Sequence, residues 1–212
     1  MPSISHAYVV AADSVIELLS RPEVAAGWHE PSALPEWTVG GLGGHLAGQI
    51  FSVVDVVGAP PADQDPISVD EHYARAAWVS AGLDDEVNIG IRAGGDDNAA
   101  PGPAELLARA NQALGRAADL LDRQPEGRVA LIPWQGWALR LDDFLITRMM
   151  EIAVHSDDLA CSVDVEAPLL PAEVLEPVLA LLTRLAITRY GQSAVLSALT
   201  RSERAPATIA VF

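Results

Sequence analysis

Glu151 and His155 have the spacing of two ligands that can share one cation. They lie in LDDFLITRMMEIAVHSDDLACSV, residues 141–163, which reads as a single helix with acids in its first turn. Residues three or four positions apart on a helix share a face, so Arg148 and Asp158 extend the same stripe. Charged side chains are rarely buried unless they are paired or bind a metal. A polar stripe in an otherwise apolar helix therefore predicts half of a metal site.

A third ligand has to come from another helix, and His45 is the only histidine within a strongly apolar one. Its segment, EWTVGGLGGHLAGQIFSVVDVVG, predicts a helix with Thr38 as N-cap. Two histidines and one glutamate with an open position form a catalytic zinc set. The HExxH motif is absent, and so are the repeated Glu-x-x-His pairs of di-iron bundles. The alternative is a buried Arg148–Glu151 ion pair beside a hydrogen-bonded His155.

The helix that carries His45 is unusually rich in glycine. Each glycine inside a helix costs roughly 0.5–1 kcal/mol relative to alanine. A run of this kind therefore indicates the close approach of another backbone or of a ligand. The residues concerned are Gly40, Gly41, Gly43, Gly44 and Gly48.

The remaining segments have to position these two helices. Apolar periodicity predicts further helices over residues 5–20, 68–80, 103–124 and 171–190, a short helix from residue 191, and a short extended segment or hairpin near 129–138. Residues 91–103 are expected to form an exposed, mobile loop. We expect His72 to be exposed or at the rim of a pocket, with a role inside a substrate pocket as the alternative. Trp134 and Trp137 are expected to pack in the core, with a place at the mouth of a pocket as the alternative.

Composition narrows the class of protein. The chain has 212 residues, of which 50% are apolar and only 5% aromatic, and this favours a helical bundle over a β-sandwich. The net charge of −16 argues against nucleic acid and anionic membranes as partners. The single cysteine, Cys161, rules out an internal disulfide and is expected to be buried. MPSISHAYVV lacks the features of a signal peptide, so we expect a cytoplasmic protein.

Three segments together resemble the mycothiol-dependent maleylpyruvate isomerase family: EWTVGGLGGHLAGQ, DDFLITRMMEIAVHSDDLA and AVLSALTRSERAP. The resemblance covers nearly the whole chain. It implies an all-α fold, with a DinB-like four-helix bundle over residues 1–165 and a C-terminal helical extension, residues 166–212, packed on it. It also implies zinc bound by His45, Glu151 and His155. The same donor set is compatible with nickel, cobalt or iron.

The family further implies a transferase or isomerase that uses mycothiol, or a similar low-molecular-weight thiol, as co-substrate. A thiol on the metal becomes a thiolate, which can attack a small electrophile such as an activated alkene, epoxide or halide. The isomerase carries a further C-terminal domain with an active-site arginine, and we expect no such catalytic domain in this sequence, which ends at Phe212. The alternatives are a non-catalytic metal-binding sensor or stress protein and, last, a metal-assisted hydrolase. A homodimer is one option for the oligomeric state.

Arg148 and Asp158 are expected to support the metal ligands. For Arg148 we predict a salt bridge to Glu151 or Asp158, with contact to a substrate carboxylate as the alternative. Asp158 is expected to orient or cap its helix locally. It could instead accept a hydrogen bond from a histidine ligand, as carboxylates commonly do at metal sites.

Overall fold

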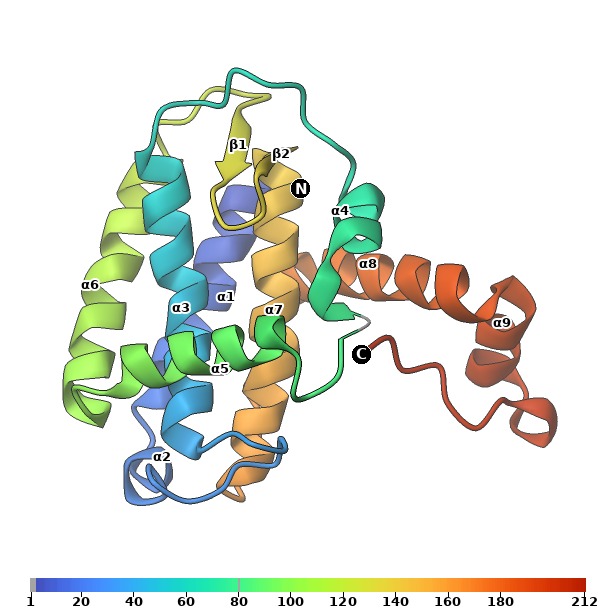
Figure 1. Ribbon diagram of the computed structural model, residues 1–212, viewed down its shortest axis with the longest axis horizontal. Helices are drawn as coiled ribbons and strands as arrows, with labels where there is room; N and C mark the ends of the chain where they lie inside the picture. The colour runs from blue at the N-terminus through green and yellow to red at the C-terminus, as the bar shows by residue number, and fades with distance from the viewer. Residues whose placement is uncertain (1–2, 80) are drawn as a thin grey trace.

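Four long helices form the body of the protein in the computed structural model, which describes residues 3–79 and 81–212 (Figure 1). They are α1 (Ile4–Leu19), α3 (Val39–Gly58), α6 (Pro103–Leu121) and α7 (Leu141–Ser162). Helices α1 and α3 each contact both α6 and α7, so the four helices close a bundle. This arrangement confirms the all-α, DinB-like four-helix fold.

Shorter elements connect and cover the bundle. They are α2 (Pro22–Ala26), α4 (Val69–Arg75), the 3₁₀ turn η1 (Ala77–Val79), α5 (Glu86–Ala99), strands β1 (Val129–Ile132) and β2 (Trp137–Arg140), α8 (Ala172–Tyr190), α9 (Gln192–Thr200) and η2 (Ser202–Arg204). The helix predicted over residues 68–80 is divided between α4 and η1, and its last position, Ser80, lies outside the described residues. Helix α5 crosses the bundle, and α8 contacts α7 and α1 before carrying α9 away from the bundle (Figure 1).

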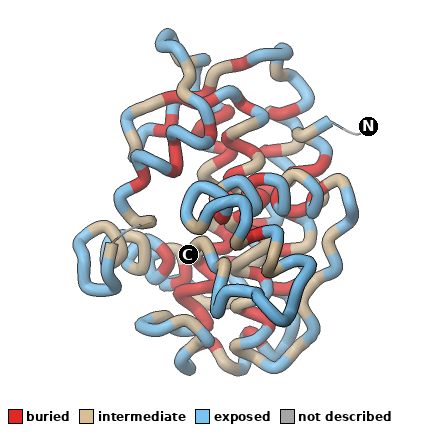
Figure 2. The backbone as a smooth tube through the Cα atoms, turned by 90° about the vertical axis from the view of Figure 1, so that its right-hand side faces the viewer, coloured by how far each residue is buried: buried red, intermediate tan, exposed pale blue. Residues whose placement is uncertain are grey.

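The core lies between the four long helices. Burial of these apolar surfaces is the main source of stability for such a bundle. Buried positions alternate with exposed ones along the helices (Figure 2). Among the largest fully buried side chains are Tyr8, Leu42, Leu46, Phe144, Leu145 and Met149. Within the described part of the chain, no helix combines the length and the apolar character that crossing a membrane requires.

Helix α5 corrects the prediction of a mobile loop at residues 91–103. It packs across α3 where both helices lack side chains: a Cβ on Gly95 would lie 2.6 Å from the Gly41 oxygen, and one on Gly44 would overlap the Gly95 oxygen. The glycine run on α3 therefore admits a second backbone, one of the two explanations expected for it. Helix α5 itself buries only Gly95 and Ala99, so its order comes mainly from the contact with α3.

The helix ends and the hairpin set the alignment of α3 and α7. Thr38 caps α3 as predicted, since its hydroxyl accepts a hydrogen bond from the Gly41 amide at 2.9 Å. Strand β2 pairs antiparallel with β1 and runs directly into α7, so Arg140 is the N-cap of α7. Asp142 and Asp143 lie in the first turn, where the helix dipole favours negative charge. The hairpin confirms the extended segment predicted near residues 129–138.

Candidate metal centre

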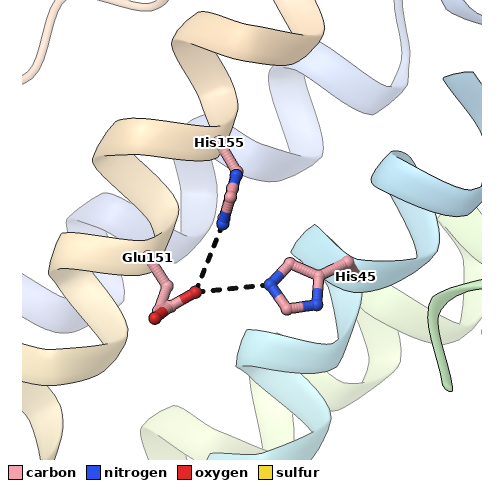
Figure 3. A group of neighbouring side chains, drawn as sticks. All are labelled: His45, Glu151 and His155. Carbon is pink, nitrogen blue, oxygen red and sulfur yellow. Dashed lines mark hydrogen bonds and ion pairs between the residues drawn. The ribbon is translucent and has the colours of Figure 1, made fainter. Parts of the chain in front are cut away.

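The three predicted ligands meet between α3 and α7. His45 projects from α3 toward Glu151 and His155, which lie one turn apart on α7 (Figure 3). The Glu151 Oε2 atom lies 3.3 Å from His45 Nε2 and 3.4 Å from His155 Nε2. One donor atom from each residue lies within 4.8 Å of the others. The structure therefore brings together all three residues that the sequence singled out.

The spacing of these donor atoms fits a small divalent cation. Zinc lies about 2.0–2.1 Å from nitrogen and oxygen ligands, so neighbouring ligands of a tetrahedral site are about 3.3 Å apart. The two His–Glu distances, 3.3 and 3.4 Å, agree with that value. Three protein donors leave a fourth position for a further ligand. The donor types and these two distances are compatible with zinc and with other divalent metals.

The cluster lies on the wall of a cavity of about 670 Å³. The side chains of His45, Glu151 and His155 are only 16%, 12% and 21% exposed, so they are largely shielded from bulk water. Helix α5, the η1 turn and the hairpin complete the wall. Residues lining the cavity include Trp37, His72, Trp78, Val87, Ile91, Trp134, Arg148, Met150 and Val154.

Charge within the cluster is set by competition between burial and hydrogen bonding. Burial lowers the pKa of His155, but hydrogen bonds to Asp158 and Glu151 outweigh it and raise the pKa to about 9. Burial favours a protonated Glu151, yet contacts with His155 and His45 hold its pKa well below the usual range. For His45, burial prevails and lowers the pKa. The metal-free cluster at neutral pH thus pairs a protonated His155 with an ionised Glu151.

Asp158 fixes the orientation of the His155 ring. His155 Nδ1 donates to Asp158 Oδ2 at 3.0 Å, and this leaves Nε2 directed at Glu151. A carboxylate behind a histidine ligand selects its tautomer and raises its basicity. Asp158 was expected to orient or cap its helix locally or, alternatively, to accept a hydrogen bond from a histidine. The structure shows the hydrogen bond to His155.

The salt bridge predicted for Arg148 is wrong: within the described residues Arg148 pairs with neither Glu151 nor Asp158. Its Nη1 donates to Gln49 Oε1 at 2.7 Å and its Nε donates to Thr147 Oγ1 at 3.2 Å. The physical reason is that both carboxylates already face the histidines. Arg148 therefore turns across the bundle to α3 and keeps its positive charge at the cavity wall.

Gln49 is a member of this network that the sequence analysis did not single out. It is 4% exposed, and its Nε2 donates to the His45 backbone oxygen at 3.0 Å while lying 3.2 Å from His45 Nε2. Because its amide oxygen faces Arg148, the side chain links that guanidinium to His45. The sequence does contain an indication of this role, since Gln49 follows His45 by one helical turn on the same face.

Three further expectations need correction. His72 is 3% exposed, so it is not a surface residue, but it does line the cavity, as the alternative for it had it. The Trp137 indole donates to its Nδ1 at 3.0 Å. The burial of His72 depends on the hairpin folding against α4, a contact that local sequence does not encode. Trp134 is 53% exposed and lines the cavity, so it lies at the mouth of the pocket and not in the core. Cys161 is also exposed, because it lies on the outer face of α7 near the end of the helix.

Comparison with known proteins identifies the family to which the chain belongs. A protein-family model described as the mycothiol maleylpyruvate isomerase N-terminal domain matches residues 10–160, a range that contains the whole His45–Glu151–His155 cluster. Neither the search of curated proteins nor that of solved structures found a match. The match covers most of the chain, and the resemblance seen in the sequence is confirmed. The protein belongs to the mycothiol maleylpyruvate isomerase N-terminal domain family.

Proposed function

We propose that this protein is a metal-dependent enzyme, with zinc as the preferred metal, that transfers a low-molecular-weight thiol such as mycothiol to a small electrophile or isomerises that electrophile. The observation that carries the proposal is the cluster of His45, Glu151 and His155 donor atoms on the wall of a cavity. Membership of a family described by mycothiol supports the choice of thiol.

Each residue of the site has a defined role in this proposal. His45, Glu151 and His155 hold the metal, and Asp158 keeps the His155 ring in register. A bound divalent metal would lower the pKa of a thiol from its free value of about 8.5, so that the thiolate persists at neutral pH. Shielding of the cluster from bulk water strengthens the electrostatic interactions within the cavity.

The cavity suits two small reactants. Its volume of about 670 Å³ lies within the range of roughly 300–1,000 Å³ that is usual for ligand sites. Trp37, Trp78 and Trp134 provide aromatic surface, while Arg148 provides a positive charge for an anionic group. An acidic chain with a net charge of −16 otherwise repels anions, so a cation at this wall would help to select the ligand's orientation.

The test is thiol consumption by the zinc-loaded protein. Mycothiol and a panel of activated alkenes, epoxides and halides are incubated with it, and loss of free thiol is followed against buffer with the same zinc concentration. We expect acceleration that is lost in His155→Ala. The matched control is His29→Ala, which removes an exposed histidine that is not part of the cavity lining and should keep full activity.

The outcomes separate the competing functions. Zinc binding without acceleration of any electrophile would refute the enzyme and favour a non-catalytic metal-binding protein. Hydrolysis of esters or amides without thiol, lost in His155→Ala, would instead favour a hydrolase that uses metal-bound water.

A further inference from the structure

The tautomer of His72 is fixed by its partner. Trp137 Nε1 lies 3.0 Å from His72 Nδ1, and an indole N–H can only donate a hydrogen bond. His72 Nδ1 must therefore accept, so the ring proton resides on Nε2. Burial, followed by the charge of Arg148, lowers the pKa of His72 to about 4, which keeps the ring neutral at physiological pH.

The same ring lies on the wall of the metal cavity. His72 lines it together with Arg148 and the three residues of the cluster. Its orientation is held by perpendicular contacts with Tyr73, at 5.0 Å between ring centroids, and with Trp137, at 5.9 Å. Within the described residues, the hydrogen bond at Nδ1 is the only one made by this ring. The fold thus holds a neutral, preoriented N–H donor beside the cluster.

We propose that His72 donates a hydrogen bond from Nε2 to a carbonyl-type oxygen of the substrate. This inference rests on the proposed function for its chemistry, but not for the binding of a carbonyl ligand. A neutral donor suits this position, because a protonated histidine would repel the metal ion and Arg148.

The role of the donor follows from where charge develops. When a thiolate adds to an alkene conjugated to a carbonyl group, a sulfur–carbon bond forms. The π pair of the alkene then becomes the carbon–carbon π bond of an enolate, and the π pair of the carbonyl moves onto its oxygen. The adjacent carbon then takes a proton from water, which balances the proton lost when the thiol ionised. A preoriented donor stabilises the oxygen most strongly when it is negative, and losing one such donor typically costs about 10²–10³ in kcat.

Binding can be tested without any reaction. The zinc-loaded protein is titrated with cyclohexanone in the absence of thiol, and the His72 ring nitrogens and its Nε2 proton are followed by NMR. We expect a saturable shift of the Nε2 proton, and no such shift with methylenecyclohexane, which has the same shape but no oxygen. In His72→Leu, binding followed by the Trp78 indole signal should weaken roughly 2- to 12-fold, the contribution of one hydrogen bond. His29→Leu is the matched control and should bind like the parent.

Two further variants keep the test decisive. Trp137→Phe retains the imidazole but removes the donor to Nδ1, so the ring should populate both tautomers in the NMR spectrum and bind cyclohexanone more weakly. With mycothiol and cyclohexenone, His72→Leu should lower kcat far more than it changes KM. His72→Gln, whose amide N–H can approach the Nε2 position, should restore part of kcat.

The inference is overturned if cyclohexanone shifts the Trp78 indole but not His72, if methylenecyclohexane binds equally well, or if no cavity signal changes at the solubility limit of the ligand. A protein that binds cyclohexanone through His72 yet turns over no electrophile would support this binding role. The same result would refute the proposed enzymatic function, so the two failures can be told apart.

Discussion

Zinc binding should displace a proton from His155, which makes the apparent zinc affinity rise with pH. In the metal-free protein, hydrogen bonds to Asp158 and Glu151 outweigh the effect of burial and hold the pKa of His155 at about 9. Burial lowers the pKa of His45, and the histidines hold the pKa of Glu151 well below its usual range. Near neutral pH, only one of the three proposed ligands therefore carries a proton that the metal must remove.

The size of the effect follows from that pKa. Below about pH 9, the unprotonated fraction of His155 changes tenfold per pH unit, so the apparent Kd for zinc should fall about tenfold, or about 1.4 kcal/mol, between about pH 6 and pH 7. At about pH 7 the pH lies about two units below the pKa of His155, so the bound proton weakens zinc binding by about 3 kcal/mol.

Calorimetry of zinc binding tests this directly. The titration is run with a competing chelator at the two pH values, each in buffers of different ionisation enthalpy, so that the number of released protons is measured independently of affinity. We expect about one proton per zinc. The range stops at neutral pH because zinc-bound water itself ionises near pH 7 and would add a proton above it.

Asp158→Asn provides the matched control. It keeps a side chain of the same size but removes the carboxylate that raises the pKa of His155, so proton release near pH 7 should decrease. An affinity that is the same at both pH values, or release of two protons by the parent protein, would refute the protonation states assigned to the cluster.

Three other predictions follow from the same structure. The metal-free protein should lose stability as the pH rises from about 6.5, the pKa of His155 in the unfolded chain, to about 9, its pKa in the folded protein. Protonation of His155 stabilises the fold by about 3 kcal/mol at most below this range, and that contribution is lost as the pH rises through it. Urea unfolding measures the change, and an unchanged midpoint across this range would contradict it. Above about pH 9, where His155 of the parent is already unprotonated, Asp158→Asn should weaken zinc binding about 10- to 100-fold, as measured by chelator competition. An unaltered Kd there would show that the carboxylate does not support His155 as a ligand. Gly44→Ala should destabilise the fold by about 1–3 kcal/mol, because the added Cβ would overlap the backbone of α5. Gly90→Ala has open space around the added Cβ and should be neutral or stabilising by up to about 1 kcal/mol. Equal unfolding midpoints for the two variants would argue against the close α3–α5 contact.

Much of the site could be predicted because its signals are local. The one-turn spacing of Glu151 and His155 places them on one helical face, and His45 stands out as a histidine in an apolar, glycine-rich helix. The glycine run itself predicted a close approach, and the structure identifies the approaching group as the α5 backbone near Gly95.

The predictions that failed concern contacts between distant segments. Helix α5 buries only Gly95 and Ala99, so its residues form a weak apolar pattern, and its order comes mainly from the contact with α3. His72 is nearly buried, and its hydrogen-bond partner Trp137 lies 65 residues later in the chain. Arg148 reaches Gln49 across the bundle, whereas its own helix suggested an acidic partner. Local spacing identifies candidate ligands, but the partners that orient them depend on packing.

The most direct test of the metal centre is anomalous X-ray diffraction at the zinc edge from crystals of the zinc-loaded protein. We expect one strong peak about 2.0–2.1 Å from His45 Nε2, Glu151 Oε2 and His155 Nε2, and no peak there in His155→Ala crystals treated in the same way. A parent crystal without a peak between these three residues, or a peak of equal strength in the variant, would contradict the assignment of the cluster as the metal site.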